Sequence, residues 1–324
     1  MDVVRTIGRI AIVLLCAVAQ FANAQVWPAK PVRMVAVFPP GGSVDQVARV
    51  LSQQLSTQLN QTFIVDNKGG ASGSIGTADV ARAAPDGYTF AVVFDTHAVN
   101  PSLIPNLPFN TTKDLVPVIL IGTSPMAIVA HVSQPFNDFR AVIAAAKNKP
   151  GSVAYGSIGA GSLGHLAMAQ IGNQLGVEFT HVPYRGGGPL MNDAIAGQVP
   201  LAIGTVFLVT PHVKGGKVKA LAVTSSQPDA QLPGALPVAQ QGVPGFEAVA
   251  WWGVFAPAGT PQAIVQRMYD ELAKALKVPA VAERLTGQGM TLRGGTPEEL
   301  QRFLTAEIAR CGKVVKDNNI KSGD

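Results

Sequence analysis

Residues 38–51 read FPPGGSVDQVARVL and join two different patterns. The run that ends at Phe38 is apolar on both faces, which predicts a strand over residues 32–38 buried in a parallel sheet. Apolar side chains at helical spacing predict a helix over residues 44–59. Two prolines and two glycines separate the strand from the helix, so the connecting loop is stiff and almost bare of side chains.

This first glycine loop has two interpretations. Ser43 and Gln46 have the spacing of a capping box, which predicts a well-formed helix start and would explain the loop as a tight connection. Gly41 and Gly42 lack Cβ atoms, and the free N–H groups of a helix N-terminus carry partial positive charge. A small anion could therefore bind the backbone here. Taken alone, the loop favours the tight connection.

The first 24 residues, 1–24, have the features of a signal peptide. Arg5 and Arg9 precede the apolar run IAIVLLCAVAQFA, and ANA at 22–24 fits a cleavage site. The apolar run is too short to span a bilayer comfortably. We therefore expect an exported protein whose mature chain begins at Gln25.

Composition excludes several classes of function. Cys311 is the only cysteine after the leader, so we expect no intrachain disulfide and no cysteine-based metal cluster. The net charge is +5 with 14% charged residues, and basic runs are lacking, which argues against a nucleic-acid partner. The patterns G-x-S-x-G and H-E-x-x-H are also lacking. We expect no catalytic residues, no bound metal and no cofactor.

A second glycine loop repeats the plan of the first. Residues 159–164, GAGSLG, lie between a predicted strand at about 153–157 and a predicted helix whose first turn contains His165. With Glu178 downstream, this spacing is also the pattern of a dinucleotide site, and a nicotinamide-dependent dehydrogenase is the enzyme alternative. Export and the position in mid-chain disfavour that cofactor. A carboxylate could use the same backbone donors without a nucleotide.

Strand and helix patterns alternate along the chain, which predicts an α/β fold with crossover connections. Apolar stretches at 116–132 and 248–261 are long enough to run between two α/β halves. The predicted domains are residues 25–127 plus 250–324 and residues 128–249. Because ligands of open α/β sheets bind at the carboxyl ends of strands, we expect the ligand cleft between these domains.

Six segments carry a family resemblance: WPAKPVRMVAVFPPGGSVDQVARVLSQQL, GGASGSIGTADVARAAPDGYT, YGSIGAGSLGHLAM, VPYRGGGP, AGQVPLAIG and WWGVFAPAGTP. In this order and spacing they resemble the solute receptors of tripartite tricarboxylate transporters, often called Bug-type receptors. The resemblance implies a two-domain periplasmic-binding-protein fold of type II that closes on a small carboxylated solute. It also implies delivery to a membrane permease with a large and a small subunit. We expect a monomer.

The resemblance also implies which residues hold the solute, through backbone donors, hydroxyls and bridging waters. By motif they are Phe38, Pro40, Gly41, Gly42, Ser43, Ser157, Gly159, Gly161, Ser162 and His165, with Thr96 and Tyr184 as further candidates.

Arg185 follows Tyr184 at the end of a predicted strand. It could pair with a carboxylate, or it could be a solvated loop charge.

Three positions depart from the family pattern. Pro200 stands where an acid is common, Thr205 stands where the family often has Asp, and Cys311 replaces a usual Trp. Thr205 is expected at the cleft, so it is included among the ligand-binding candidates. Presentation of the bound solute to a membrane signalling partner, such as a sensor kinase, is an alternative to transport that the sequence leaves open.

Overall fold

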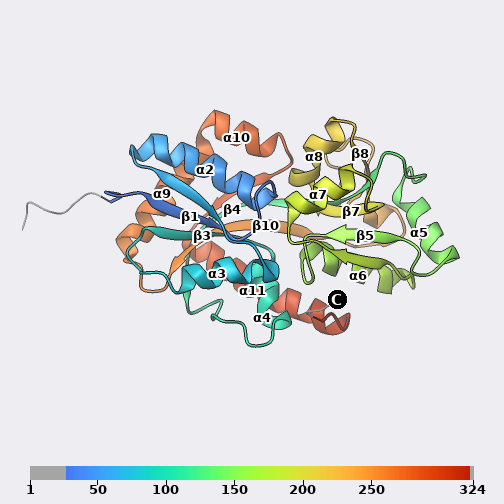
Figure 1. The fold of residues 1–324 in the computed structure, drawn as a ribbon, viewed down its shortest axis with the longest axis horizontal. Helices are drawn as coiled ribbons and strands as arrows, with labels where there is room; N and C mark the ends of the chain where they lie inside the picture. Colours follow the sequence, from blue (N-terminus) through green and yellow to red (C-terminus); the bar gives the residue numbers. More distant parts are fainter. Residues whose placement is uncertain (1–26, 322–324) are drawn as a thin grey trace, which may run out of the picture.

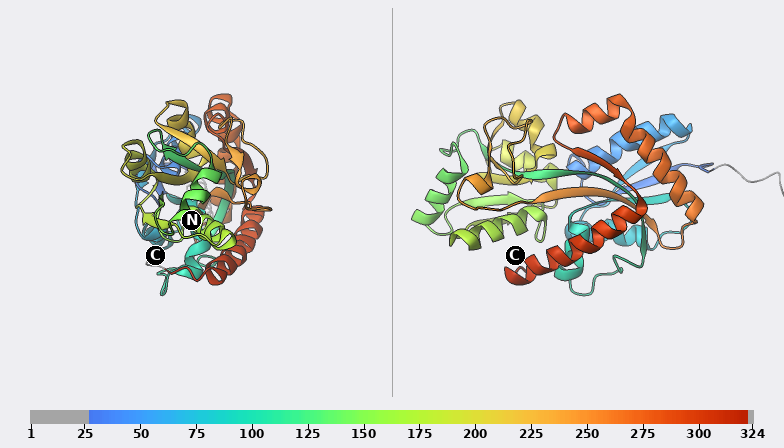
Figure 2. Two further views of the ribbon diagram at one scale, coloured as in Figure 1. Left: turned by 90° about the vertical axis from the view of Figure 1, so that its right-hand side faces the viewer. Right: turned by 180° about the vertical axis from the view of Figure 1, so that it is seen from behind.

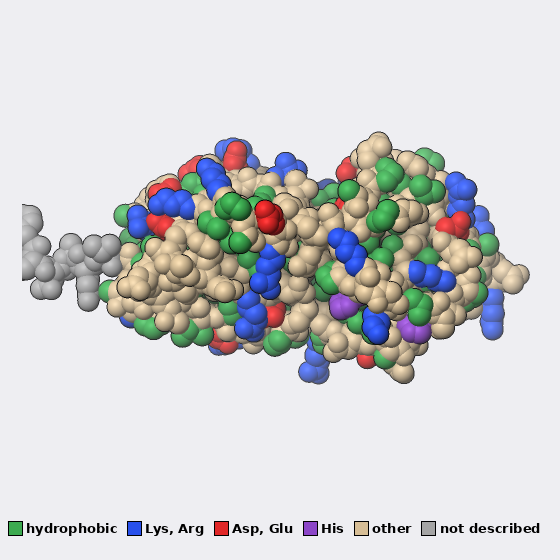
Figure 3. All heavy atoms as spheres, turned by 90° about the horizontal axis from the view of Figure 1, so that it is seen from above, with side chains coloured by type: hydrophobic (Ala, Val, Ile, Leu, Met, Phe, Trp, Pro, Cys, Tyr) green, Lys and Arg blue, Asp and Glu red, His purple; other side chains and the backbone are tan. Residues whose placement is uncertain are grey.

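The computed structural model describes residues 27–321, and Figure 1 shows them as an elongated molecule of two lobes. The predicted signal peptide lies outside the described residues. Within those residues, no helix is both long and apolar enough to cross a membrane. On the face drawn in Figure 3, positive and negative side chains are scattered over a largely uncharged surface, and several lie next to a side chain of opposite sign.

The first lobe is built from the beginning and the end of the chain. Its elements are β1 (Val32–Ala36), α2 (Ser43–Leu59), β2 (Phe63–Asn67), the 3₁₀ turn η1 (Ala71–Gly73), α3 (Ser74–Ala81), β3 (Thr89–Phe94), α4 (Thr96–Leu103), α9 (Gln262–Lys277), α10 (Pro279–Thr286), β11 (Thr291–Gly295) and α11 (Pro297–Asp317).

The second lobe comes from the middle of the chain. Its elements are α5 (Phe139–Asn148), β5 (Ala154–Ser157), α6 (Leu163–Leu175), β6 (Thr180–Pro183), α7 (Gly187–Ile195), β7 (Leu201–Thr205), α8 (Val206–Lys214), β8 (Val218–Val223), β9 (Leu236–Pro237) and the 3₁₀ turn η2 (Val238–Gln240).

Two antiparallel strands connect the lobes, β4 (Leu115–His131) and β10 (Val249–Pro257). β4 pairs with β10 and β11 over its first part and with β7 and β8 over its last part, so one continuous strand serves both lobes. The main path of the sheet runs β2-β1-β3-β10-β4-β7-β5-β6. The predicted crossings therefore exist as strands, while the division at 127/128 and 249/250 stays a prediction.

In each lobe, parallel strands are joined by helices. β1 pairs in parallel with β2 and β3, and β5 pairs in parallel with β6 and β7. Parallel neighbouring strands require crossover connections. The intervening segments, whose apolar residues have helical spacing, form the helices that make these connections. The apolar run predicted as a strand forms β1, in which every residue except Arg33 is buried. The predicted α/β class is confirmed.

The core is continuous across the strands that join the lobes. The Trp252 side chain on β10 is fully buried. Its ring centroid lies 5.0 Å from that of Phe94 on β3 and 5.6 Å from that of Phe207 on α8. One aromatic residue of a crossing strand thus packs against both lobes.

Helix α11 runs from the first lobe along the back of the molecule toward the second (Figure 2). It packs against α4, and Cys311 is among its buried residues. Just beyond its end, Asn318 accepts a hydrogen bond of 2.7 Å from the Asn173 amide of α6. The C-terminal helix therefore provides a contact between the lobes that is separate from β4 and β10.

The predicted capping box at Ser43 and Gln46 is wrong. The N-cap of α2 is Gly42, with extended backbone, and Ser43 is already helical. The Asp45 carboxylate accepts the N–H of Gly41 at 3.0 Å, and the Gln46 amide donates to the Gly41 carbonyl at 3.2 Å. A glycine accepts the N-cap conformation easily, so the cap moved one residue earlier and the carboxylate replaced the serine hydroxyl.

Candidate functional site

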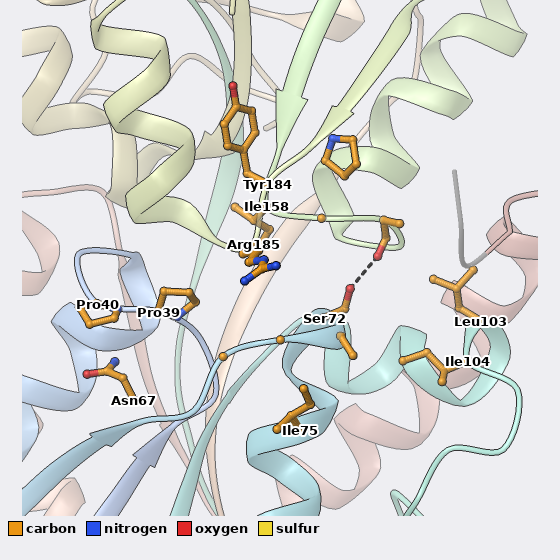
Figure 4. Close-up of a pocket in the computed structure, with 16 residues that line it drawn as sticks. Pro39, Pro40, Asn67, Ser72, Ile75, Leu103, Ile104, Ile158, Tyr184 and Arg185 are labelled. Carbon is orange, nitrogen blue, oxygen red and sulfur yellow. Dashed lines mark hydrogen bonds between the residues drawn. The ribbon is translucent and has the colours of Figure 1, made fainter. Parts of the chain in front are cut away.

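A cavity of about 810 Å³ lies where the two lobes meet, and Figure 4 shows its lining. The first lobe contributes Pro39, Pro40, Asn67, Gly69, Gly70, Ala71, Ser72, Ile75, Leu103 and Ile104, and the second contributes Ile158, Gly159, Ala160, Pro183, Tyr184 and Arg185. The volume is within the usual range for small-molecule sites, roughly 300–1,000 Å³.

One wall of the cavity has an unusual backbone. Gly70, Ala71, Ser72 and Gly73 all have positive φ angles, of 125°, 45°, 51° and 84°. Ala71 and Ser72 carry Cβ atoms, so this conformation costs on the order of 1–3 kcal/mol for each of them. Such strain persists where surrounding contacts impose it, and it is typical of binding and catalytic sites.

Ser72 is held by contacts from both lobes. Its hydroxyl donates to the carbonyl of Ala160 at 2.7 Å, across the boundary between the lobes. Its own carbonyl accepts the amide of Asn100 on α4 at 3.1 Å. These contacts fix the strained segment against the second glycine loop.

Side chains behind the cavity wall fix the second glycine loop. The Ser157 hydroxyl lies 2.7 Å from His181 Nε2 and accepts the Gly159 N–H at 3.2 Å. His165 Nδ1 accepts the Gly161 N–H at 3.1 Å. The His165 and His181 rings stack with centroids 4.0 Å apart and planes within 7°. His165 therefore supports the loop from below and is absent from the lining of the cavity.

The first glycine loop contacts a third glycine-rich segment, residues 186–188 at the start of α7, and not the second glycine loop. A Cβ atom built at Gly42 would lie 3.4 Å from the N atom of Gly187, and one at Gly188 would lie 2.3 Å from the Pro40 carbonyl oxygen. The starts of α2 and α7 thus lie backbone to backbone. The second glycine loop faces Ser72 and Leu103.

Arg185 has the only charged side chain in this lining, among the residues that the structure describes. It is exposed and has no ion pair within residues 27–321. Figure 4 shows the guanidinium pointing into the space between Pro39 and Ser72. The Tyr184 ring points the other way, and its hydroxyl donates to Asp193 at 3.0 Å. Burial, with the Asp193 carboxylate, raises the pKa of Tyr184 to about 12.

Asp95 is a buried carboxyl at the same boundary between the lobes. It precedes the first residue of α4 without a side-chain cap hydrogen bond, and its Oδ1 accepts the N–H of Leu163, the first residue of α6, at 3.4 Å. Burial raises the pKa of Asp95 to about 8, although the hydrogen bond from Leu163 opposes the shift. The other carboxyl oxygen has no partner among the described residues.

Of the predicted ligand residues, Pro40, Gly159 and Tyr184 line the cavity. Gly41 and Gly42 form the contact between the lobes, and Ser43, Ser157, Gly161 and His165 lie outside the lining. Phe38 packs edge-on against Phe94, and Thr96 is buried at the start of α4. Ser162 and Thr205 cap α6 and α8 with their hydroxyls. Thr205, expected at the cleft, is buried and lies outside the lining of this cavity. Binding roles for all of these residues stay predictions.

Sequence reasoning missed the strained segment and the apolar side chains. Residues 69–72, with Ile75, form one wall, and Leu103 and Ile104 extend it. The run GGASG at 69–73 was the available signal, because a dense glycine cluster after a strand marks unusual backbone. No comparable pattern marks Leu103 or Ile104.

Among the described residues, no three His, Cys, Asp or Glu side chains gather as a metal site would require. The second glycine loop packs against the other lobe: a Cβ atom at Gly161 would lie 2.0 Å from Leu103 Cδ2. Leu103 therefore occupies the space beside Gly161 that a pyrophosphate would need in a dinucleotide site.

Comparison with known proteins identifies the family. The family described as "Tripartite tricarboxylate transporter family receptor" matches residues 47–320. The protein BugT of Bordetella pertussis is 35% identical over 324 residues, covering 99% of each chain.

Two solved structures from Rhodopseudomonas palustris have the same fold. Rpa4515 with adipate is 34% identical, with a TM-score of 0.87 over 91% of this chain and 99% of that chain. MatC with bound malate is 31% identical, with a TM-score of 0.84 over 89% and 100%. These matches confirm the predicted periplasmic-binding-protein fold, and the family consists of receptors, so the dehydrogenase alternative is excluded. The chain belongs to the tripartite tricarboxylate transporter receptor family.

Proposed function

We propose that this receptor captures a small carboxylate-bearing solute in the periplasm, between its two lobes, and delivers it to a tripartite membrane permease. The observation that carries the proposal is the cavity lined by both lobes, with Arg185 as its charged side chain. A guanidinium pairs well with a carboxylate. The structures of relatives with adipate and malate support the same class of ligand.

The binding mechanism is closure of the lobes about β4 and β10. The contacts of Gly42 with Gly187, and of Ser72 with Ala160, join the lobes around the cavity. A solute that touches both walls adds contacts only when these loops meet. It therefore shifts the population toward the closed arrangement.

The first test is calorimetry and thermal unfolding of residues 25–324 against mono-, di- and tricarboxylates, amino acids and aromatic acids. A true ligand at 100 times its Kd should add about 2.7 kcal/mol to the free energy of unfolding. If every acid leaves the unfolding temperature unchanged, the receptor proposal fails.

Delivery to a permease is tested separately in cells. Deleting the receptor gene should abolish uptake of the solute that calorimetry identifies, and the wild-type gene should restore it. Uptake that continues at the same rate without the receptor would contradict delivery, and would leave binding for another purpose, such as sensing.

A further inference from the structure

We propose that the solute is a monocarboxylate with an apolar body, whose carboxylate pairs with Arg185 while its body lies against an aliphatic wall. This inference rests on the proposed function and specifies the ligand class of the same cavity.

The charge of the lining sets the first limit. Within the described residues, Arg185 is the single cation of the cavity wall, and no Asp or Glu side chain lines it. The guanidinium is not neutralised by a protein carboxylate, because it has no ion pair or hydrogen bond within residues 27–321. One unpaired cation matches one carboxylate.

The other polar side chains of the lining are already engaged. The Asn67 amide donates to the Phe38 carbonyl at 3.0 Å, and its oxygen accepts from Arg49. The Ser72 hydroxyl donates to Ala160. A second carboxylate would therefore find only backbone groups, and no further cation or unengaged polar side chain, to replace its lost hydration, which disfavours its burial relative to an apolar body.

Four large aliphatic side chains also line the cavity, beside its glycines, alanines and prolines. Ile75 is 54% exposed, one of the few large apolar side chains left open on the described surface. It lies with Leu103, Ile104 and Ile158 along the lining. Figure 4 shows Leu103 and Ile104 on the opposite side of the cavity from Pro39 and Asn67, with Arg185 between. An apolar ligand body would cover Ile75 while its carboxylate remained at Arg185.

The test compares three probes with the same six-carbon skeleton: hexanoate, adipate and hexanamide. Calorimetry should show hexanoate binding at least tenfold more tightly than adipate and hexanamide. The variant Arg185→Gln should weaken hexanoate at least tenfold, whereas Arg284→Gln, at an exposed position on α10, should not change it. Ile75→Ser should weaken hexanoate several-fold and leave acetate binding unchanged.

The outcomes separate the two proposals. Adipate binding as tightly as hexanoate would overturn the monocarboxylate inference and leave the receptor function in place. Full hexanoate affinity in Arg185→Gln, with native circular dichroism, would remove Arg185 from the site. Failure of every carboxylate in the broader panel would overturn the proposed function itself.

Discussion

At the residue scale, Gly188 and Gly42 occupy opposite sides of one contact between the lobes but tolerate a side chain differently. A Cβ atom at Gly188 would lie 2.3 Å from the carbonyl oxygen of Pro40, a backbone atom that cannot turn aside. The nearest atom to a Cβ at Gly42 would be 3.4 Å away, which is ordinary contact. The loops can therefore accept alanine at Gly42, whereas alanine at Gly188 must push them apart.

We predict that Gly188→Ala weakens ligand binding roughly tenfold or more and increases the radius of gyration of the ligated protein. Calorimetry and small-angle X-ray scattering provide these measurements. Gly42→Ala is the matched control and should remain close to wild type in both. Equal behaviour of the two variants would contradict the proposed closure of these loops.

Asp95 makes stability depend on pH in a defined direction. Its pKa is about 8 in the folded protein, because of burial, against about 4 in an unfolded chain. Between these values the folded state holds a proton that the unfolded state has released. The free energy of unfolding should therefore fall as pH rises through this window, by at most about 1.4 kcal/mol per unit, and level off above it.

The comparison that isolates this carboxyl is wild type against Asp95→Asn, by urea unfolding at pH 5, 6.5 and 8.5. The amide has no proton to lose, so the free energy of unfolding of the variant should increase relative to that of wild type as the pH rises. Glu307 and Arg310 act on Asp95 in opposite directions and remain in both proteins. A difference between the two proteins that is the same at every pH would rule out titration of Asp95 as its source.

At the element scale, the two helices with capping-box sequences differ. Thr296 caps α11, and its hydroxyl accepts the Glu299 N–H while the Glu299 carboxylate accepts the Thr296 N–H. Ser43 forms no such bond at α2. We predict that Thr296→Ala lowers the free energy of unfolding by about 1 kcal/mol, with a smaller loss for Ser43→Ala. Urea unfolding of both variants is the measurement, and a larger loss for Ser43→Ala would contradict the assignment.

The same two helices show why an element can be predicted more reliably than its first residue. The spacing of apolar residues over 44–59 predicts a helix, and α2 covers this segment. Either Ser43 or Gly42 could be the N-cap of α2. Gly42 is the N-cap when a nearby carboxylate accepts the Gly41 N–H. Asp45 does so. The side chains of Ser43, Asp45 and Gln46 all lie close enough in the sequence to accept a hydrogen bond from the N–H groups at the start of α2. Their spacing alone does not show which of them does so.

The glycine-rich run at 69–73 signals unusual backbone in the cavity wall, but the strain at Ala71 and Ser72 could not be predicted from it. Residues 70–73 hold positive φ angles because Ser72 is bonded to Ala160 and to Asn100, which are 88 and 28 residues away. Local propensity opposes this conformation at Ala71 and Ser72. The contacts that impose it exist only once both lobes have folded.

At the scale of the whole molecule, the α/β alternation and the two crossings followed from long apolar runs, which form β4 and β10. The pairing of loops across the lobes did not follow. The two glycine loops share one plan in the sequence, yet the first lies against Gly187 and Gly188 and not against the second. Which loops meet depends on how the two lobes are placed relative to each other, and no short motif records that geometry.

Because Ser124 on β4 and Ala250 on β10 are register partners, the chain leaves for the second lobe and returns from it at adjacent points of one antiparallel pair. Replacing residues 125–249 by an Asn-Gly turn would close this pair as a β-hairpin. We predict that the shortened protein unfolds cooperatively in urea, followed by circular dichroism. A transition without cooperativity would refute this. The whole second lobe is, in this sense, an insertion at the tip of a hairpin, so recombination could exchange it between related receptors without rebuilding the lobe that carries it.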